Sequence, residues 1–420
     1  CEIWVYFCFM YTKKFLVFDK NTIFIILILL FWLFAPFLTI FLVLLLFCKR
    51  LSICQYKCMF LVISMSFALL AYTQKSLFYL DTDIIRYYNA YYPFIDQSFD
   101  LFSLMFVLEN NLTFSFNLIN VLLVCTFANV QIISIFWVFC IYYFYFLSLL
   151  KLFEHEGISI SPINILLVTF ISIFGFILFT QVTDTIKNAA SFAIFFYAFI
   201  CFICNENKLK IILLYIIGVG IHSSILMLLP LFLYKKINTQ ILILLFILAV
   251  LISSRINIMS LFSIILPDVG FGSLLLKKAE TYSIVGDAQS SIRYIGISCV
   301  MLLSAIYLSI NKLFNVSNKY MNIIFIYLII MYLNYNNPDG YIRFANFAHF
   351  LFLFEFIQLL RDKKRYSLVI FLFIVVFIVT NFQMTYSRTL SGGYCSSYMN
   401  NSIFQILFSN VVEYLSFKAY

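Results

Sequence analysis

Long apolar runs recur along the whole chain, and they limit its fold more than any other feature. The first extends from about Thr22 to Cys48, and a membrane-spanning helix needs only about 20 such residues. Hydrophobic residues make up 64% of the chain and charged residues 11%, whereas soluble domains have roughly 45–50% apolar and about 25% charged residues. The runs are continuous, so the alternating segments of a membrane β-barrel are excluded. The sequence predicts an all-α polytopic membrane protein with about 10–12 transmembrane helices.

Lysines and arginines between the apolar runs indicate how the chain is oriented, because cytoplasmic loops carry an excess of them. The net charge of +9 lies mostly in these short loops, which indicates membrane orientation rather than nucleic-acid binding. We expect one integral membrane domain over residues 1–420, with large external segments at about 73–126 and 254–294. The predicted spans are about Thr22–Cys48, Cys58–Tyr72, Phe127–Leu150, Ile163–Thr180, Ala189–Cys204, Gln240–Ser253, Ile295–Ile310, Tyr320–Tyr335, Phe344–Leu360 and Leu368–Phe382.

The stretch Ile211–Tyr234 carries lysines at both ends and is interrupted in its middle by Gly218, Gly220 and His222. Irregular backbone at membrane depth must be shielded by protein or face a cavity. We therefore expect a broken, re-entrant hairpin of two short half-helices over residues 211–234, with His222 near the turn. A single span that places the two following lysines outside is the alternative.

A polar stretch from Tyr79 to Phe94 interrupts the apolar sequence just after the second span. Charges this close to a membrane cost free energy unless they are solvated or paired, which makes the stretch a candidate functional site. Its tyrosines suit either the membrane interface or the binding of sugar rings. Downstream, Phe99–Phe116 is amphipathic and is expected to lie along the membrane surface. The polar and aromatic residues of the stretch include Asp81, Asp83, Arg86, Tyr87, Tyr88, Tyr91 and Tyr92.

Simpler structural roles stay open for several of these residues. Asp81 or Asp83 can cap a short helix, and Asp83 can pair with Arg86 three residues further on. The two carboxylates also suit Mg²⁺ or Mn²⁺, although the sequence shows no further clear oxygen ligands, so we predict no metal or other cofactor. His222 can be a histidine that packs between helices.

Three cations fall in loops predicted to be external, where the positive-inside rule predicts few. They are Lys187, Arg293 and Arg343, and His222 lies on the same side. An anionic ligand explains them, because guanidinium groups hold phosphate oxygens bidentately and lysine acts as a point charge. The alternatives are that Arg293 extends its side chain to the membrane surface and that Lys187 is an interfacial lysine.

Four motifs resemble those of the EpsG/Wzy-type polysaccharide polymerases of bacterial cell-surface glycan clusters. They are Asp81-x-Asp83-x-x-x-Tyr87-x-x-x-Tyr91, Lys187-Asn-Ala-Ala, Gly220-Ile-His222-Ser-Ser and Asp339-Gly-Tyr-Ile-Arg343-Phe. The order of spans and loops is also similar, and together the matches cover most of the chain. The family commonly has arginine where Lys187 stands, a departure that keeps the positive charge.

The resemblance implies a glycosyltransferase in the bacterial inner membrane with its active site on the periplasmic or outer face. Such an enzyme joins polyprenyl-diphosphate-linked oligosaccharide repeat units into O-antigen or capsular polysaccharide. Its partners would be this lipid-linked oligosaccharide and membrane lipids. The resemblance also allows a chain-length regulator protein as a partner. The substrate-binding residues expected are Arg86, Tyr87, Tyr88, Tyr91, Lys187, Arg293 and Arg343, and the catalytic residues expected are Asp81, Asp83 and His222.

Within this hypothesis the cations hold the diphosphate, a carboxylate or His222 accepts the proton of the acceptor hydroxyl, and the tyrosines stack on sugars. Three rival functions remain. A polyprenyl-phosphate-sugar-dependent glycosyltransferase and an O-antigen ligase differ in donor or acceptor. A lipid-linked oligosaccharide flippase belongs to another class, but transporters tend to show internal repeats and charges at the bilayer midplane, and neither is evident here.

Overall fold

A computed structural model provides the fold. It describes residues 20–49, 51–76, 83–95, 97–109, 113–158, 162–173, 177, 179–253, 320–335, 396–399 and 402–417, with residues 340, 341, 343, 344, 347, 350, 351, 353, 354 and 357. Within these residues, three helices are long and apolar enough to cross a membrane, namely α4 (Ile53–Tyr72), α8 (Ile132–His155) and α11 (Ile186–Ile203). As predicted, the chain is an all-α polytopic membrane protein.

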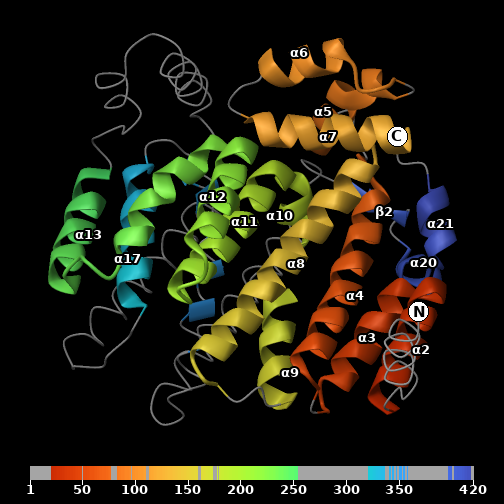
Figure 1. Cartoon of the computed structure of the whole chain (residues 1–420), viewed down its shortest axis with the longest axis horizontal. Helices are drawn as coiled ribbons and strands as arrows, with labels where there is room; N and C mark the ends of the chain where they lie inside the picture. The colour runs from red at the N-terminus through yellow and green to blue at the C-terminus, as the bar shows by residue number, and fades with distance from the viewer. Residues whose placement is uncertain are drawn as a thin grey trace, which may run out of the picture.

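Helices α4, α8 and α11 pack side by side and form the centre of the bundle (Figure 1). The first begins at a capping box, in which the Ser52 hydroxyl accepts the N–H of Gln55 and the Gln55 side chain accepts the N–H of Ser52. Aromatic stacking joins it to α8, since the ring centroids of Phe60 and Phe146 are 4.4 Å apart. Burial of such rings supplies much of the packing energy of a helix bundle.

The two ends of the bundle differ in charge. At one end, Glu206 forms ion pairs with Lys151, at the close of α8, and with Lys210, at a distance of 2.8 Å. These pairs hold the last turns of α8 and α11 against α12 (Lys208–Ile221). We call this the lysine-rich end, and the positive-inside rule predicts that it faces the cytoplasm.

The first apolar run forms two helices, so the prediction of one span over Thr22–Cys48 is wrong. Helix α2 (Lys20–Phe34) stops at Ala35, and α3 (Pro36–Leu46) begins at a proline, which lacks an N–H and favours a first helical turn. The ammonium of Lys49, just after α3, lies 5.5 Å from the ring of Phe24 near the start of α2. The two helices therefore fold back on each other as a V with its tip at Ala35.

The fourth predicted span, Ile163–Thr180, also differs from the structure. Helix α9 covers Pro162–Ile171, and α10 covers Phe179–Asp184. The second of these is a helix of only 6 residues that leads through Thr185 into α11. It packs against both α8 and α11.

Helix α12 and the 3₁₀ helix η4 (Ser223–Leu233) run antiparallel, with His222 between them. The ring of Tyr215 on α12 lies 5.8 Å from that of Phe232 near the end of η4, so the chain returns to the lysine-rich end. The structure thus places a helical hairpin over the predicted range. Its depth in a membrane stays a prediction.

At the opposite end, helices α5 (Asp83–Tyr91), α6 (Leu101–Glu109) and α7 (Phe114–Phe127) lie across the tips of the upright helices (Figure 1). We call them the external layer, because the sequence predicts that this part of the chain lies on the external side of the membrane. Amphipathic Phe99–Phe116 was predicted as one surface segment, but α6 ends before residue 110 and α7 starts at residue 114. Helix α7 buries Asn120 and exposes Leu122 and Phe127. Apolar side chains that face outward in this way suit a helix whose outer side contacts lipid.

The C-terminal part returns to the beginning of the external layer. Strand β2 (Ser396–Tyr398) pairs antiparallel with β1 (Gln74–Ser76), directly after α4. Helices α20 (Ile403–Phe408) and α21 (Val411–Ser416) then pack on α3 and α4. On the other side of the bundle, α13 (Thr239–Ser253) packs against α17 (Met321–Leu333) (Figure 1).

Candidate functional site

The start of α11 brings a lysine into contact with the external layer. Lys187 lies in the first turn of α11, and its ammonium is 5.4 Å from the centroid of the Phe116 ring and 5.9 Å from that of Tyr87. The two rings, from α7 and α5, contact each other edge to face at 5.1 Å. A cation over aromatic faces is attracted by the ring quadrupole. We call Tyr87 and Phe116 the aromatic platform.

A tryptophan of the central bundle holds the platform in place. Trp137 of α8 stacks on Phe116, with centroids 5.3 Å apart and planes inclined by 20°. The Trp137 indole donates a hydrogen bond of 2.7 Å to the side-chain oxygen of Asn120 on α7. Phe116 and Trp137 are each only 1% exposed, so the ring of Phe116 has little freedom to move. The central bundle therefore fixes the platform on which Lys187 lies.

The hydroxyl of Tyr87 lies in a charged environment. Burial raises the pKa of the Tyr87 phenol well above its usual range, and the nearby Asp83 carboxylate raises it further. The guanidinium of Arg343 acts in the opposite direction and lowers this pKa, so it lies within electrostatic range of the phenol. Because burial dominates, the phenol keeps its proton at neutral pH and is a hydrogen-bond donor beside Arg343.

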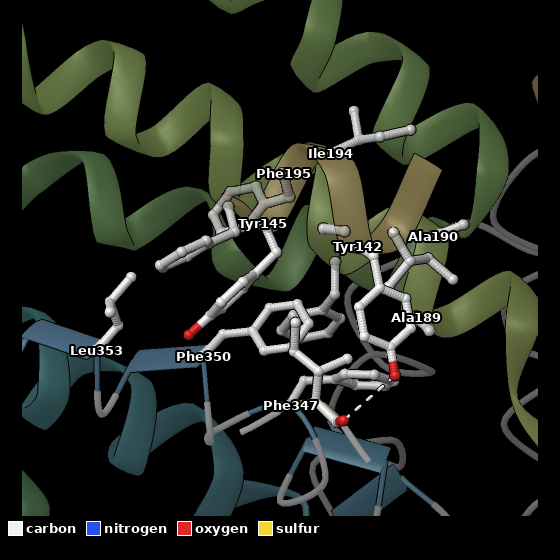
Figure 2. Packing of buried hydrophobic residues seen from close by; sticks show 14 of the residues in the cluster. Tyr142, Tyr145, Ala189, Ala190, Ile194, Phe195, Phe347, Phe350 and Leu353 are labelled. Atoms are coloured by element: carbon white, nitrogen blue, oxygen red, sulfur yellow. Dashed lines mark hydrogen bonds between the residues drawn. The ribbon is translucent and has the colours of Figure 1, made fainter. Parts of the chain in front are cut away.

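Arg343 comes from a helical segment far away in sequence. Two rings that follow it, Phe344 and Phe347, lie 6.2 Å and 4.5 Å from the ring of Phe192 on α11. Phe350, one turn further, lies 5.1 Å from Tyr145 of α8, so this segment runs along the groove between α8 and α11 (Figure 2). Packing of these rings against α11 explains why Arg343 reaches the same end of the bundle as Lys187.

Asp83 and Arg86 form the i,i+3 ion pair that the sequence offers as an alternative, with 2.5 Å between the two groups. The Arg86 side chain is 58% exposed, and exposed ion pairs are screened and weak. The pair can therefore open for a ligand at small cost. Asp83 is a carboxylate that acts electrostatically on the Tyr87 phenol.

Two of the predicted sugar-stacking tyrosines are buried instead. Tyr88 is 0% exposed and shares a hydrogen bond of 2.5 Å with Ser134 of α8. Tyr91 is 2% exposed and donates a hydrogen bond of 2.6 Å to Asn117 of α7. Neither ring has a face open to a sugar, so both anchor α5 to the layer beneath it. Here the expectation of stacking does not fit the structure.

His222 caps the 3₁₀ helix η4 with its ring. The backbone N–H of Ser224 donates to His222 Nδ1 at 3.2 Å, and the Ser224 hydroxyl lies 2.7 Å from the same nitrogen. A nitrogen that accepts carries no proton, so the neutral ring holds its proton on Nε2 and presents a donor there. This arrangement opposes the predicted role of His222 as a general base.

A close contact joins the His222 turn to the external layer. A Cβ added to Gly220 of α12 would lie 2.2 Å from the hydroxyl oxygen of Ser115, so a larger residue there would have to displace the Ser115 side chain. Ser115 precedes Phe116 of the platform in sequence. The turn at His222 thus lies beside the α7 end that carries the platform.

Two predicted site residues, Asp81 and Arg293, lie outside the residues that the structure describes. The divalent-cation alternative at Asp81 and Asp83 stays a prediction. In the described part of the chain, no three His, Cys, Asp or Glu side chains gather as they would around a metal ion.

Comparison with known families decides the relationship. The model of the EpsG family matches residues 76–400, from the strand before the external layer to just beyond strand β2. The chain belongs to the EpsG family. Comparisons with curated proteins and with solved structures gave no match. Membership of the EpsG family suggests a polysaccharide-polymerase-like function of the glycosyltransferase kind.

All the candidate residues that the structure describes lie within the EpsG match. Sequence reasoning did not find Phe116, Asn117, Ser134 or Trp137, which hold the platform and the tyrosines of α5 in place. One signal for them was present. Asn117 and Asn120 recur at helical spacing within an apolar run, where an unpaired amide would be costly.

Proposed function

We propose that this EpsG-family protein joins polyprenyl-diphosphate-linked oligosaccharide repeat units into a surface polysaccharide. The observation that supports the proposal is the convergence of Lys187, Arg343 and the neutral Tyr87 phenol at the end of the bundle opposite the lysine-rich end. Two cations and a donor suit a diphosphate, and the positive end of the α11 helix dipole lies at the same place. The site would face the periplasm or exterior of a bacterial inner membrane.

The proposed reaction moves the growing chain from one lipid carrier onto the next unit. The bond between the anomeric carbon and the diphosphate oxygen breaks, and the electron pair leaves with the polyprenyl diphosphate. A hydroxyl of the incoming unit forms the new glycosidic bond and loses its proton. Asp83 is proposed to accept or orient that proton, and Lys187 with Arg343 to stabilise the charge on the leaving group. Asp81 and Arg293 remain proposed partners in these roles.

The polyprenyl chain requires an apolar surface next to the diphosphate site. Helix α7 provides one, because Phe114, Leu122 and Phe127 are exposed on the helix that carries Phe116. Membrane lipid or the polyprenyl chain can cover such a surface without loss of hydrogen bonds. The lipid tail and the diphosphate would then bind to the outer and inner sides of one helix.

The function is tested in a strain that lacks the gene, by gel analysis of its surface polysaccharide. A polymerase predicts that the long-chain ladder disappears while a single repeat unit still reaches the lipid core, and that the wild-type gene restores the ladder. Loss of every unit with precursor held inside would instead indicate a flippase. Polymer that never reaches the lipid core would indicate a ligase, and an unchanged ladder would contradict the proposal.

Variants of His222 distinguish its role as a hydrogen-bond donor from the predicted role as a general base. In His222→Gln the side-chain amide lies near the position of Nε2 and still donates, so we expect chain elongation in proteoliposomes to stay within a few-fold of wild type. In His222→Ala the donor is lost, and on the order of 10²-fold of the rate should be lost with it. Ser224→Ala, which removes only the neighbouring hydroxyl, is the control. Equal inactivity of the Gln and Ala variants, at wild-type expression and Tm, would restore the base hypothesis.

A further inference from the structure

We propose that Phe116 is the positioning residue of Lys187: its ring holds the ammonium at the place where the diphosphate would bind. The inference rests on the proposed function only for the identity of that ligand. The placement of the lysine itself follows from the geometry. The Lys187 ammonium lies closer to the centroid of Phe116, at 5.4 Å, than to that of Tyr87, at 5.9 Å.

A lysine side chain on its own is a poor fixed charge. It has a flexible four-carbon stem, and holding it in one geometry costs conformational entropy. A rigid aromatic surface reduces that cost because it confines the ammonium. Phe116 is rigid for this purpose because Trp137 stacks on it and both rings are buried.

Phe116 differs in this respect from the other platform ring. Tyr87 is partly buried, and its hydroxyl lies among charged groups, so it has a direct role open to it. Phe116 has no polar atom and is 1% exposed, so it cannot contact a phosphate itself. Its ring electrons can therefore act on ligand binding only through the side chains it contacts at the platform, Lys187 and Tyr87. The lysine signal described below reports on the contact with Lys187 alone.

The experiment replaces Phe116 in the full-length protein with phenylalanines that carry one, two or three ring fluorines. Fluorination keeps the shape of the ring but weakens the quadrupole that attracts a cation. In nanodiscs, the Kd for a polyprenyl diphosphate should rise stepwise, by about 2- to 30-fold over the series. The same series at Phe60, a buried ring that stacks on Phe146 of α8, should leave the Kd unchanged.

A second measurement needs no ligand. Lysines are labelled by reductive ¹³C-methylation, and the Lys187 signal is assigned by its absence in Lys187→Arg. Ring currents should displace this signal from the free-lysine position, and Phe116→Leu should move it back. If the signal is not displaced, or does not respond to Phe116→Leu, the inference is wrong.

The two measurements separate the inference from the proposed function. A wild-type protein that binds no polyprenyl diphosphate would contradict the proposed function, and the lysine signal would then decide on Phe116 alone. Diphosphate binding that is unaffected by fluorination would show that the ring does not position the charge, and would overturn the inference while the function stands.

Discussion

Removal of the positive charge at Arg343 should abolish the long-chain polymer in a protein that is still folded. Arg343 is the guanidinium that acts on the Tyr87 phenol from the segment after α17, and a leaving diphosphate needs such a donor in the transition state. We expect Arg343→Ala, and likewise Lys187→Met, to lower the rate of chain elongation on the order of 10²-fold. The measurement is elongation of lipid-linked repeat units in proteoliposomes.

Matched variants show whether the position of the charge matters or only its presence. Lys75→Met removes a lysine that also lies over an aromatic ring, Phe417 at 4.7 Å, but outside the platform, and should be close to wild type. Arg343→Lys keeps the charge without the bidentate fork and should have an intermediate rate. Full activity of Arg343→Ala, at wild-type expression and thermal stability, would remove Arg343 from the site.

Substitution of Gly220 by valine should destabilise the contact between α12 and the external layer. It should also stop chain elongation, although Gly220 lies away from the charged groups. The Cβ would lie 2.2 Å from the Ser115 hydroxyl oxygen and 3.0 Å from the Ser115 Cβ, and the larger valine would displace the Ser115 side chain and push α12 away from α7. Overpacking of this kind costs about 1–3 kcal/mol. We expect a lower Tm in detergent together with a loss of elongation activity.

Gly218 provides the control on the same helix. A Cβ there would meet the Ser191 carbonyl oxygen at 3.5 Å, an ordinary contact, so Gly218→Ala should be neutral or stabilising by up to about 1 kcal/mol. Gly220→Ala combined with Ser115→Gly should recover the Tm that Gly220→Ala alone loses. A Gly220→Val protein as stable and active as wild type would show that the two helices do not need this close approach.

The helical bundle was predictable because apolar runs of membrane-spanning length leave few other folds. Where the runs break was less predictable. Pro36 lies inside one unbroken apolar run, and proline both kinks helices and begins them. Whether the chain continued straight or turned back at Ala35 depended on packing against α4, for instance the hydrogen bond from the Ser66 hydroxyl to the Pro36 carbonyl.

The candidate site was predictable in its charges but not in its aromatic residues. Lys187 and Arg343 contradicted the positive-inside pattern and so attracted attention from sequence alone. Tyr88 and Tyr91 lie on one side of a helix with Tyr87 on another, and composition does not tell which ring faces the core. Phe116 is one phenylalanine among 53, and its only sequence signal is indirect, through the neighbouring Asn117 and Asn120 in an apolar run.

The V formed by α2 and α3 has a consequence for the surrounding bilayer. Helix α3 has 11 residues and rises about 16 Å, whereas the hydrocarbon core of a bilayer is about 30 Å thick. Such hydrophobic mismatch is relieved when the bilayer thins or when other apolar groups fill the missing height. Helices α20 and α21, with Phe404 and Val412 each more than 70% exposed, pack beside the tip of the V and can fill it. The bilayer on this flank would then keep its usual thickness, because these two helices supply the apolar height that α3 lacks.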